Sequence, residues 1–324
     1  MGAIKMDIMK LAKEIIEGKR LTRADDLSFF EEVDLEELCQ VANEIREKLC
    51  GNEVSLCSII NGRSGRCSED CKFCAQSGHH HTEVINYAFL DVDEIVTDCK
   101  KHADKGVHRY SIVTAGRTLK GADLEIVCKA YKKMKEECEI ELCGSHGLLD
   151  EEAFRALKMS GVTMYHENIE TSKRNFPNIC TTHTYEEKIE CIKLAQSLGF
   201  KVCSGGIIGM GETFEDRIDM AVSLAELGVN SIPINALIPI KGTAYESLKA
   251  LKEEEILRAV AMFRFINPQA YIRLAAGRIL MEDSGKKAFL SGANATITGD
   301  LLTTSGNNIE EDKTMLVQMG FEIE

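Results

Sequence analysis

The sequence lacks several features by which other classes of protein are recognised. It has no run of about 18 apolar residues and no basic-then-apolar leader, so we expect a chain that neither spans a membrane nor is secreted. Its net charge of -13 argues against a basic surface for nucleic acid or anionic lipid. Only four prolines occur and no Gly/Ser-rich linker divides the 324 residues, so we expect one domain.

Cysteine, in contrast, is abundant, with 13 residues. A secreted disulfide scaffold does not fit a chain without a leader, and an odd number of cysteines leaves one thiol unpaired. We therefore interpret these cysteines as reduced thiols of a cytoplasmic protein, some of which bind metal.

The pattern of apolar residues favours an α/β fold. From about residue 54 onward, short apolar runs alternate roughly eight times with longer charged stretches of helical character. The runs are Val54–Ile60, His108–Ala115, Glu139–His146, Val162–Asn168, Lys201–Ile207, Ser231–Leu237, Tyr271–Ala275 and Ala293–Ile297. Eight strand–helix units over about 250 residues match the size of a TIM-type (β/α)8 barrel. A doubly wound open sheet is the alternative, because periodicity does not show closure.

The first 50 residues and the rest of the chain differ in their pattern of apolar and charged residues. Residues 1–50 contain two amphipathic stretches rich in Lys and Glu, Lys5–Lys19 and Asp34–Lys48, which we interpret as an N-terminal helical extension. Residues 51–324 are expected to form the barrel with a C-terminal tail. The helix candidates between the strands run from Asp93–Lys105 to Asp283–Leu290.

Three cysteines, Cys67, Cys71 and Cys74, follow the first expected strand with the spacing C-x3-C-x2-C. Thiolates this close in sequence can converge on one metal centre, and soft sulfur ligands suit iron–sulfur clusters or zinc. Structural zinc sites usually have four ligands, and the motif lacks a fourth cysteine. A [4Fe–4S] cluster with one open iron therefore fits better, at the strand ends where barrel active sites lie. Three incidental thiols are the alternative.

Further motifs follow along the chain. They are Asn168–Ser172, Thr181–Tyr185, Lys201–Thr213, Ser231–Thr243, Ile272–Arg278, Ser291–Asn294 and Leu302–Thr304. With Cys67–Ser77 before them, the sequence from about Leu56 to the C-terminus resembles the radical S-adenosylmethionine (SAM) enzymes, and within them the biotin synthase family closely. The first motif marks the superfamily, and the later ones in this order mark the biotin synthases.

The resemblance implies a sulfur-inserting enzyme that converts dethiobiotin to biotin. By similarity, Cys67, Cys71 and Cys74 hold a [4Fe–4S] cluster whose open iron binds SAM. A 5′-deoxyadenosyl radical then takes hydrogen from C9 and C6 of dethiobiotin, and an auxiliary cluster supplies the sulfur. The resemblance also implies an electron donor such as flavodoxin or ferredoxin and a homodimer, with no nucleic-acid or membrane partner.

The same resemblance assigns roles to further residues. Those implied for SAM are Ala115, Gly116, Asn168, Glu170, His183, Ile207 and Ile208, and those implied for dethiobiotin are Asn168, Asn235, Thr303 and Thr304. The Glu170 carboxylate can accept hydrogen bonds from ribose hydroxyls, and the Asn235 amide matches the donors and acceptors of a ureido ring. His183 stands where relatives often carry arginine.

The resemblance fails at the auxiliary cluster. The best-known form of the family holds a [2Fe–2S] cluster with three cysteines and one arginine, and Cys143, Cys203 and Arg273 match three of these positions. Ser111 stands where the remaining cysteine is expected, and a neutral hydroxyl is a poor ligand for iron. Either Ser111 binds weakly as an alkoxide or is replaced by an outside ligand, or Cys57 on the neighbouring strand supplies the missing sulfur. In the second case Cys57, Cys143 and Cys203 anchor an auxiliary iron–sulfur cluster, [2Fe–2S] or larger, with Arg273 beside it. We predict the second, against the alternative that Cys57 is a buried apolar residue.

Other functions remain open at this point. A related radical SAM maturase, of the hydrogenase-cofactor or pyrrolysine type, shares the barrel and the first cluster, although Cys143, Cys203 and Arg273 argue against it. A non-catalytic iron–sulfur or zinc protein is the other alternative. The run His79–His81 is interpreted as a solvated loop, and Cys180 has no assigned role.

Overall fold

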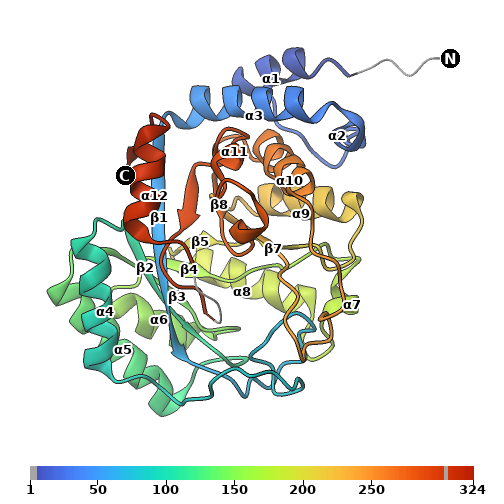
Figure 1. The fold of residues 1–324 in the computed structure, drawn as a ribbon. Helices are drawn as coiled ribbons and strands as arrows, with labels where there is room; N and C mark the ends of the chain where they lie inside the picture. Colours follow the sequence, from blue (N-terminus) through green and yellow to red (C-terminus); the bar gives the residue numbers. More distant parts are fainter. Residues whose placement is uncertain (1–5, 303–305) are drawn as a thin grey trace.

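A computed structural model describes residues 6–302 and 306–324 and shows a closed parallel barrel surrounded by helices (Figure 1). The barrel strands are β1 (Glu53–Arg63), β2 (Arg109–Thr114), β3 (Glu141–Ser145), β4 (Met164–His166), β5 (Lys201–Cys203) with β6 (Gly206–Ile208), β7 (Ser231–Ala236), β8 (Tyr271–Leu274) and β9 (Ala295–Ile297). Because β5 and β6 share one position and β9 pairs with both β8 and β1, the ring closes with eight positions. The TIM-type (β/α)8 prediction is confirmed, and the open doubly wound sheet is excluded.

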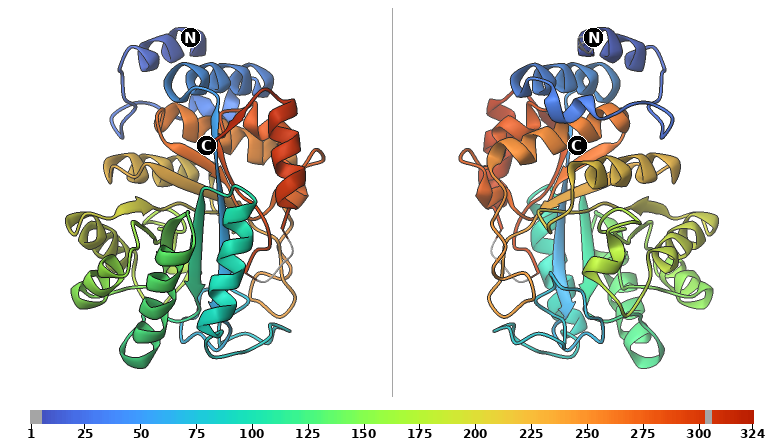
Figure 2. Two further views of the ribbon diagram at one scale, coloured as in Figure 1. Left: turned by 90° about the vertical axis from the view of Figure 1, so that its left-hand side faces the viewer. Right: turned by 90° about the vertical axis from the view of Figure 1, so that its right-hand side faces the viewer.

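Helices connect the strands and cover the outside of the barrel (Figures 1 and 2). They are α4 (Val92–Asp104), α5 (Gly121–Glu137), α6 (Glu151–Met159), α7 (Phe176–Ile179), α8 (Tyr185–Ser197), α9 (Phe214–Glu226), α10 (Glu253–Ile266), the 3-10 helix η1 (Arg278–Leu280), α11 (Lys286–Phe289) and α12 (Ile309–Gln318), after which β10 (Glu322–Ile323) pairs with the start of β1. Polar caps fix where helices begin, as at α8, where Thr184 and Glu187 bond reciprocally. None of the helices in the described ranges is long and apolar enough to cross a membrane.

Three further helices precede β1, at the end of the barrel where that strand begins (Figure 1). They are α1 (Ile8–Ile16), α2 (Phe29–Glu32) and α3 (Leu35–Cys50). Phe30 of α2 meets Phe265 of α10 edge-on, with ring centroids 5.4 Å apart. Arg258 Nη1 on α10 donates hydrogen bonds to the carbonyls of Phe30 (2.9 Å) and Val33 (2.7 Å). These contacts hold the N-terminal helices to the last long helix of the barrel.

Most of the expected elements are shorter in the structure, and for two of them the backbone shows the cause. The apolar run Val162–Asn168 contributes only Met164–His166 to the sheet, because the chain then turns to place Glu170 at φ 67°. The helix candidate Asp283–Leu290 is reduced to α11, because Ser284 (φ 58°) and Gly285 (φ 95°) adopt left-handed backbone conformations that a right-handed helix excludes.

Candidate functional site

A cavity of about 370 Å³ extends from the loop after β1 into the interior of the barrel. On β2 it is lined by Arg109, Ser111 and Val113, which are alternate positions, because every second residue of a strand points to the same side. The residues singled out from the sequence that line it are Cys57, Cys74, Cys143, Asn168, Glu170, Cys203, Ile207, Asn235 and Arg273. Thr303 and Thr304 lie outside the described residues.

The cluster loop (residues 64–82) carries Cys67, Cys71 and Cys74 and folds back on itself. The Cys67 N–H donates to the carbonyl of Gln76 (3.0 Å), and its carbonyl accepts from the N–H of Gly78 (2.7 Å). The Cys74 N–H donates to the carbonyl of Cys71 (3.0 Å). These bonds bring both ends of the motif together and leave all three thiols half-buried.

The donor set of the cluster loop fits an iron–sulfur cluster. Soft thiolates suit iron, and three cysteines rather than four leave one coordination position for another ligand. Cys74 lines the cavity, and burial, reinforced by the neighbouring Cys67, raises its pKa to about 11. With this pKa the thiol keeps its proton at neutral pH, and it releases the proton only when a cation binds the sulfur. The Cys71 sulfur points instead toward Cys180, at 3.8 Å.

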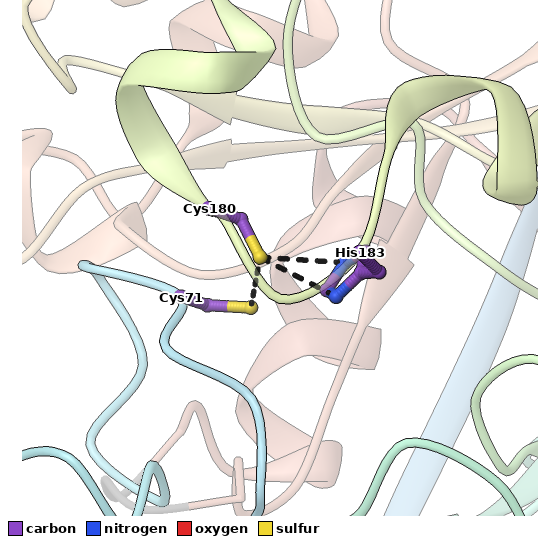
Figure 3. Close-up of side chains that lie close together, drawn as sticks. All are labelled: Cys71, Cys180 and His183. Atoms are coloured by element: carbon purple, nitrogen blue, oxygen red, sulfur yellow. Dashed lines mark hydrogen bonds between the residues drawn. The ribbon is translucent and has the colours of Figure 1, made fainter.

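Cys180 and His183 approach the cluster loop from the segment between α7 and α8 (Figure 3). The Cys180 sulfur lies 3.3 Å from His183 Nδ1, and Nδ1 lies 2.6 Å from Oε2 of Glu69. The hydrogen bond from Cys71 is the largest factor that lowers the Cys180 pKa, to about 4. Burial alone would lower the pKa of His183, but its contacts with Cys180 and Glu69 raise it. His183 thus lies beside the cluster loop, outside the barrel cavity.

Asn168 and Glu170 lie on the wall of the cavity directly after β4. Asn168 Oδ1 accepts from the Gly205 N–H (3.0 Å), and its Nδ2 donates to Glu170 Oε2 (3.3 Å). Glu170 has a left-handed backbone, which is uncommon for a residue other than glycine, and its carbonyl accepts from the Ile207 N–H (2.9 Å). Burial raises the pKa of the Glu170 carboxyl. A strained turn thus presents a carboxyl group and an amide to the cavity.

Besides His183, three residues implied for SAM do not line the barrel cavity. They are Ala115, Gly116 and Ile208. Ala115 and Gly116 border a separate cavity of about 590 Å³ beside the cluster loop. There Arg63 Nε donates to the Ala115 carbonyl (2.6 Å), and a Cβ at Gly116 would lie 2.2 Å from Arg63 Nη2. Ile208 is fully buried in the hydrophobic core, although its neighbour Ile207 lines the barrel cavity.

The deep end of the barrel cavity is the region that contains the three thiols expected at the auxiliary cluster. Cys57 on β1, Cys143 on β3 and Cys203 on β5 are all buried. Burial, followed by the proximity of Cys57 and Cys203, raises the pKa of Cys143. Burial would also raise the pKa of Cys203, but His166 and Arg273 lower it to about 7. The three sulfurs therefore lie within electrostatic reach of one another.

Two polar residues of β2 complete the deep end. Arg109 pairs with Glu141, and its Nη1 lies 3.2 Å from the sulfur of Met164. Within the described ranges, Arg109 Nε and Ser111 Oγ are buried without a hydrogen-bond partner, although both residues line the cavity. Buried polar atoms are normally satisfied. Their lack of partners marks the deep end as a place for a polar or charged group.

The sequence interpretation missed Arg109 and Cys180. Arg109 stands two residues before Ser111 in the same strand, so the period of two was a signal that both face the cavity. Its charge favours the thiolate forms of Cys57 and Cys143. Cys180 gave no such signal, because its contact with Cys71 joins positions 109 residues apart.

Comparisons with known proteins match nearly the whole chain. Residues 63–224 match the Radical SAM superfamily, and residues 233–322 match the Biotin and Thiamin Synthesis associated domain. The biotin synthase of Alkaliphilus metalliredigens is 76% identical over 318 residues, which is 98% of this chain and 100% of that protein. The biotin synthase of Clostridium beijerinckii is 65% identical over 314 residues, or 97% of this chain and 99% of that protein.

Solved structures share the fold at low identity. Methylornithine synthase superimposes with a TM-score of 0.83 at 20% identity, covering 97% of each chain. A maturase of the [FeFe]-hydrogenase superimposes with a TM-score of 0.81 at 16% identity, covering 98% of this chain and 76% of the other. At these identities the likeness concerns the barrel architecture alone.

Proposed function

Because this chain belongs to the biotin synthase family of radical SAM enzymes, we propose that its barrel cavity converts dethiobiotin to biotin with SAM at one end and a sulfur source at the other. The observation that carries this proposal is the lining of one cavity. Cys74 of the cluster loop and Cys143 and Cys203 of the deep end border the same space. A substrate between them can meet a radical source and a sulfur source without leaving the barrel.

At the outer end, we assign Cys67, Cys71 and Cys74 to a [4Fe–4S] cluster. When bound, this cluster and SAM supply a 5′-deoxyadenosyl radical that removes hydrogen from dethiobiotin. Glu170 and Asn168 orient SAM from the wall of the cavity, since carboxyl and amide oxygens accept hydrogen bonds from ribose hydroxyls. His183, Ala115, Gly116, Ile207 and Ile208 remain proposed SAM neighbours by family resemblance.

Asn235 on β7 is assigned to the ureido ring of dethiobiotin. Its Nδ2 donates to the Gly206 carbonyl (3.1 Å) and its Oδ1 accepts from the Ala276 N–H (3.1 Å). These two bonds fix the amide plane and leave one N–H and one lone pair for a substrate in the cavity. Apolar neighbours such as Leu237 and Ile240 line the same cavity and exclude water from the reacting carbons. Thr303 and Thr304 remain proposed partners of the substrate carboxylate.

At the deep end, we propose that Cys57, Cys143 and Cys203 bind an auxiliary iron–sulfur cluster, [2Fe–2S] or larger, with Arg273 beside it. When bound, this cluster supplies the sulfur that enters biotin. Arg273 Nη1 donates to the carbonyls of Ser55 (3.2 Å) and Thr296 (3.1 Å), which holds the guanidinium in place. Positive charge next to buried thiols favours the thiolates that iron needs.

The family also leads us to propose a flavodoxin or ferredoxin as electron donor and a homodimer as the working form. All 13 cysteines fall in the described ranges and none forms a disulfide, which supports a reducing, cytoplasmic setting. Size-exclusion chromatography with light scattering tests the dimer, and anaerobic reduction assays with each donor protein test the electron source.

The central experiment is anaerobic reconstitution with iron and sulfide, followed by incubation with SAM, dethiobiotin and a one-electron reductant. Mass spectrometry should detect both 5′-deoxyadenosine and biotin from the same sample. Isotopic labelling of the reconstituting sulfide should place the label in the biotin ring. Cys74→Ala should abolish both products, whereas Cys128→Ala, on the outer helix α5, should retain both.

The outcomes separate the possible functions. Biotin formation with labelled sulfur supports the proposal in full. Formation of 5′-deoxyadenosine without biotin would instead indicate a related radical SAM enzyme with another substrate. Absence of both products from a fully reconstituted chain would leave only an iron–sulfur protein without this catalysis.

A further inference from the structure

The segment after α7 brings a thiol and an imidazole next to Cys71 of the cluster loop (Figure 3). The sulfurs of Cys71 and Cys180 are 3.8 Å apart. The Cys180 sulfur lies 3.3 Å from Nδ1 and 3.8 Å from Nε2 of His183. One ligand atom from each of the three residues falls within 4.8 Å of the other two.

The Cys71–Cys180 and Cys180–His183 separations match a single tetrahedral ion. Two thiolates, each about 2.3 Å from a tetrahedral cation, stand about 3.8 Å apart, and a thiolate and an imidazole nitrogen stand about 3.6 Å apart. Ligands of different irons in a cubane cluster stand farther apart, because each binds its own corner. The arrangement of Cys71, Cys180 and His183 therefore fits one ion better than it fits two corners of a cluster.

Glu69 orients the imidazole for this purpose. Its Oε2 lies 2.6 Å from His183 Nδ1, so the Nδ1–H donates to the carboxylate and Nε2 is left free to bind a cation. Glu69 is itself held by Arg117 Nη1 (3.1 Å) and by the hydroxyl of Thr182 (2.9 Å). Histidines that bind metals commonly donate their other nitrogen to a carboxylate in this way.

We propose that, in the chain without its cluster, Cys71, Cys180 and His183 bind one thiophilic divalent cation, Fe²⁺ or Zn²⁺. Soft sulfur and imidazole suit both ions, and a water molecule takes the fourth position. Both sulfurs bind the ion as thiolates, the protons that remain on them pass to water, and no electron is transferred. Because Cys71 is shared, this ion and the [4Fe–4S] cluster exclude each other, and only this exclusion rests on the proposed function.

Cobalt is the probe, because tetrahedral Co²⁺ bound to sulfur absorbs strongly in the visible and near-ultraviolet. The full-length chain, stripped of iron and kept reduced under anaerobic conditions, is titrated with Co²⁺. We expect tetrahedral bands that saturate with one high-affinity ion per chain. Cys180→Ser and His183→Ala should each lose this high-affinity site. Glu69→Gln should weaken it by roughly 10–100-fold.

Cys67→Ser is the matched control, since it removes a thiol of the same loop that the proposed site does not use. It should keep the cobalt bands and their affinity. If Cys180→Ser and His183→Ala bind Co²⁺ as the wild type does, or if Cys67→Ser abolishes the bands, the proposed site is wrong. Circular dichroism of each variant checks that the chain is still folded where the cobalt site is lost. If one of Cys180→Ser and His183→Ala does not fold, the other alone is sufficient for the comparison with the wild type.

A second arm tests the competition and the identity of the ion. Zn²⁺ bound in advance should slow cluster formation from iron and sulfide in the wild type but not in Cys180→Ser. Fe²⁺ bound in advance should not slow it, because that ion can enter the cluster. The contrary result is that zinc-loaded wild type and Cys180→Ser form the cluster at equal rates, although the wild type binds cobalt as expected. That result would overturn the sharing of Cys71 between the ion and the cluster, and with it the assignment of Cys71 to the cluster. It would leave the single-ion site in place.

Discussion

Cys57 on β1 lies directly opposite Arg109 on β2 in the parallel register of the barrel, and both side chains line its cavity. This pairing places a fixed positive charge beside a buried thiol. Burial raises the pKa of Cys57, and the charges of Arg273 and Arg109 oppose that rise. The deep end is therefore suited to hold thiolates when a cation is present to receive them.

Removing the Cys57 thiol is expected to affect only the auxiliary cluster proposed for the deep end, and not the [4Fe–4S] cluster. In Cys57→Ala, iron content should fall to that of one [4Fe–4S] cluster, because a ligand of the auxiliary cluster is lost. Formation of 5′-deoxyadenosine should persist while biotin falls to background. Iron analysis, Mössbauer spectroscopy and product quantification check this prediction. Unchanged iron and full biotin yield in Cys57→Ala would falsify it, and Cys128→Ala serves as the control thiol.

Neutralising Arg109 should make auxiliary-cluster assembly depend on pH. Arg109→Met keeps the length of the side chain but removes the charge that lowers the pKa values of Cys57 and Cys143. Their thiols should then stay protonated to higher pH, so less auxiliary iron is incorporated at about pH 7 than at about pH 9. Iron content after reconstitution across this range is the measurement. Arg155→Met, on the exposed face of α6, should show the wild-type profile.

The carboxyl group of Glu170 should contribute mainly to binding SAM. Glu170→Gln keeps the shape but replaces an acceptor oxygen with an N–H donor, and leaving a buried hydrogen-bonding group without its partner costs about 1.5–3 kcal/mol. SAM should therefore bind roughly 10–150-fold more weakly. Equilibrium dialysis with labelled SAM measures this loss. A dissociation constant equal to that of the wild type would remove Glu170 from the proposed site, and Glu190→Gln on α8 is the control.

A buried ion pair should dominate the stability of the C-terminal part of the chain. Arg278 and Asp312 form two parallel hydrogen bonds of 2.9 and 2.8 Å that join η1 to α12, and both side chains are buried. Asp312→Asn leaves the guanidinium charge uncompensated, which should cost about 3–5 kcal/mol. Glu253→Gln breaks the more exposed pair with Lys287 and should cost less than about 1 kcal/mol. Urea unfolding of both variants tests the difference, and equal losses would contradict it.

Local patterns in the sequence predicted much of this molecule. The alternation of apolar runs and helical stretches gave the eight barrel positions, since period and length are local properties. The spacing of Cys67, Cys71 and Cys74 indicated a shared loop for the same reason. The shortened α11 was not foreseen, because the left-handed backbone at Ser284 is set by its surroundings rather than by the residue type.

Contacts between distant segments account for most of what the sequence did not reveal. Ile207 and Ile208 are adjacent and chemically alike, yet one lines the cavity and the other is in the core. Only the three-dimensional register of β6 decides which is which. The approach of Cys180 to Cys71 likewise depends on how two loops meet, which no spacing rule describes.

The position of β9 has a consequence for how the protein is made. β9 completes the ring by pairing with β1, so the wall of the cavity is finished only when residues 295–297 have left the ribosome. Cys57, Cys143 and Cys203 are all synthesised earlier, before that wall is complete. Loading of the proposed auxiliary cluster therefore belongs after translation. A chain truncated before Ala295 would keep all three thiols but would lack the strand that closes the barrel around them.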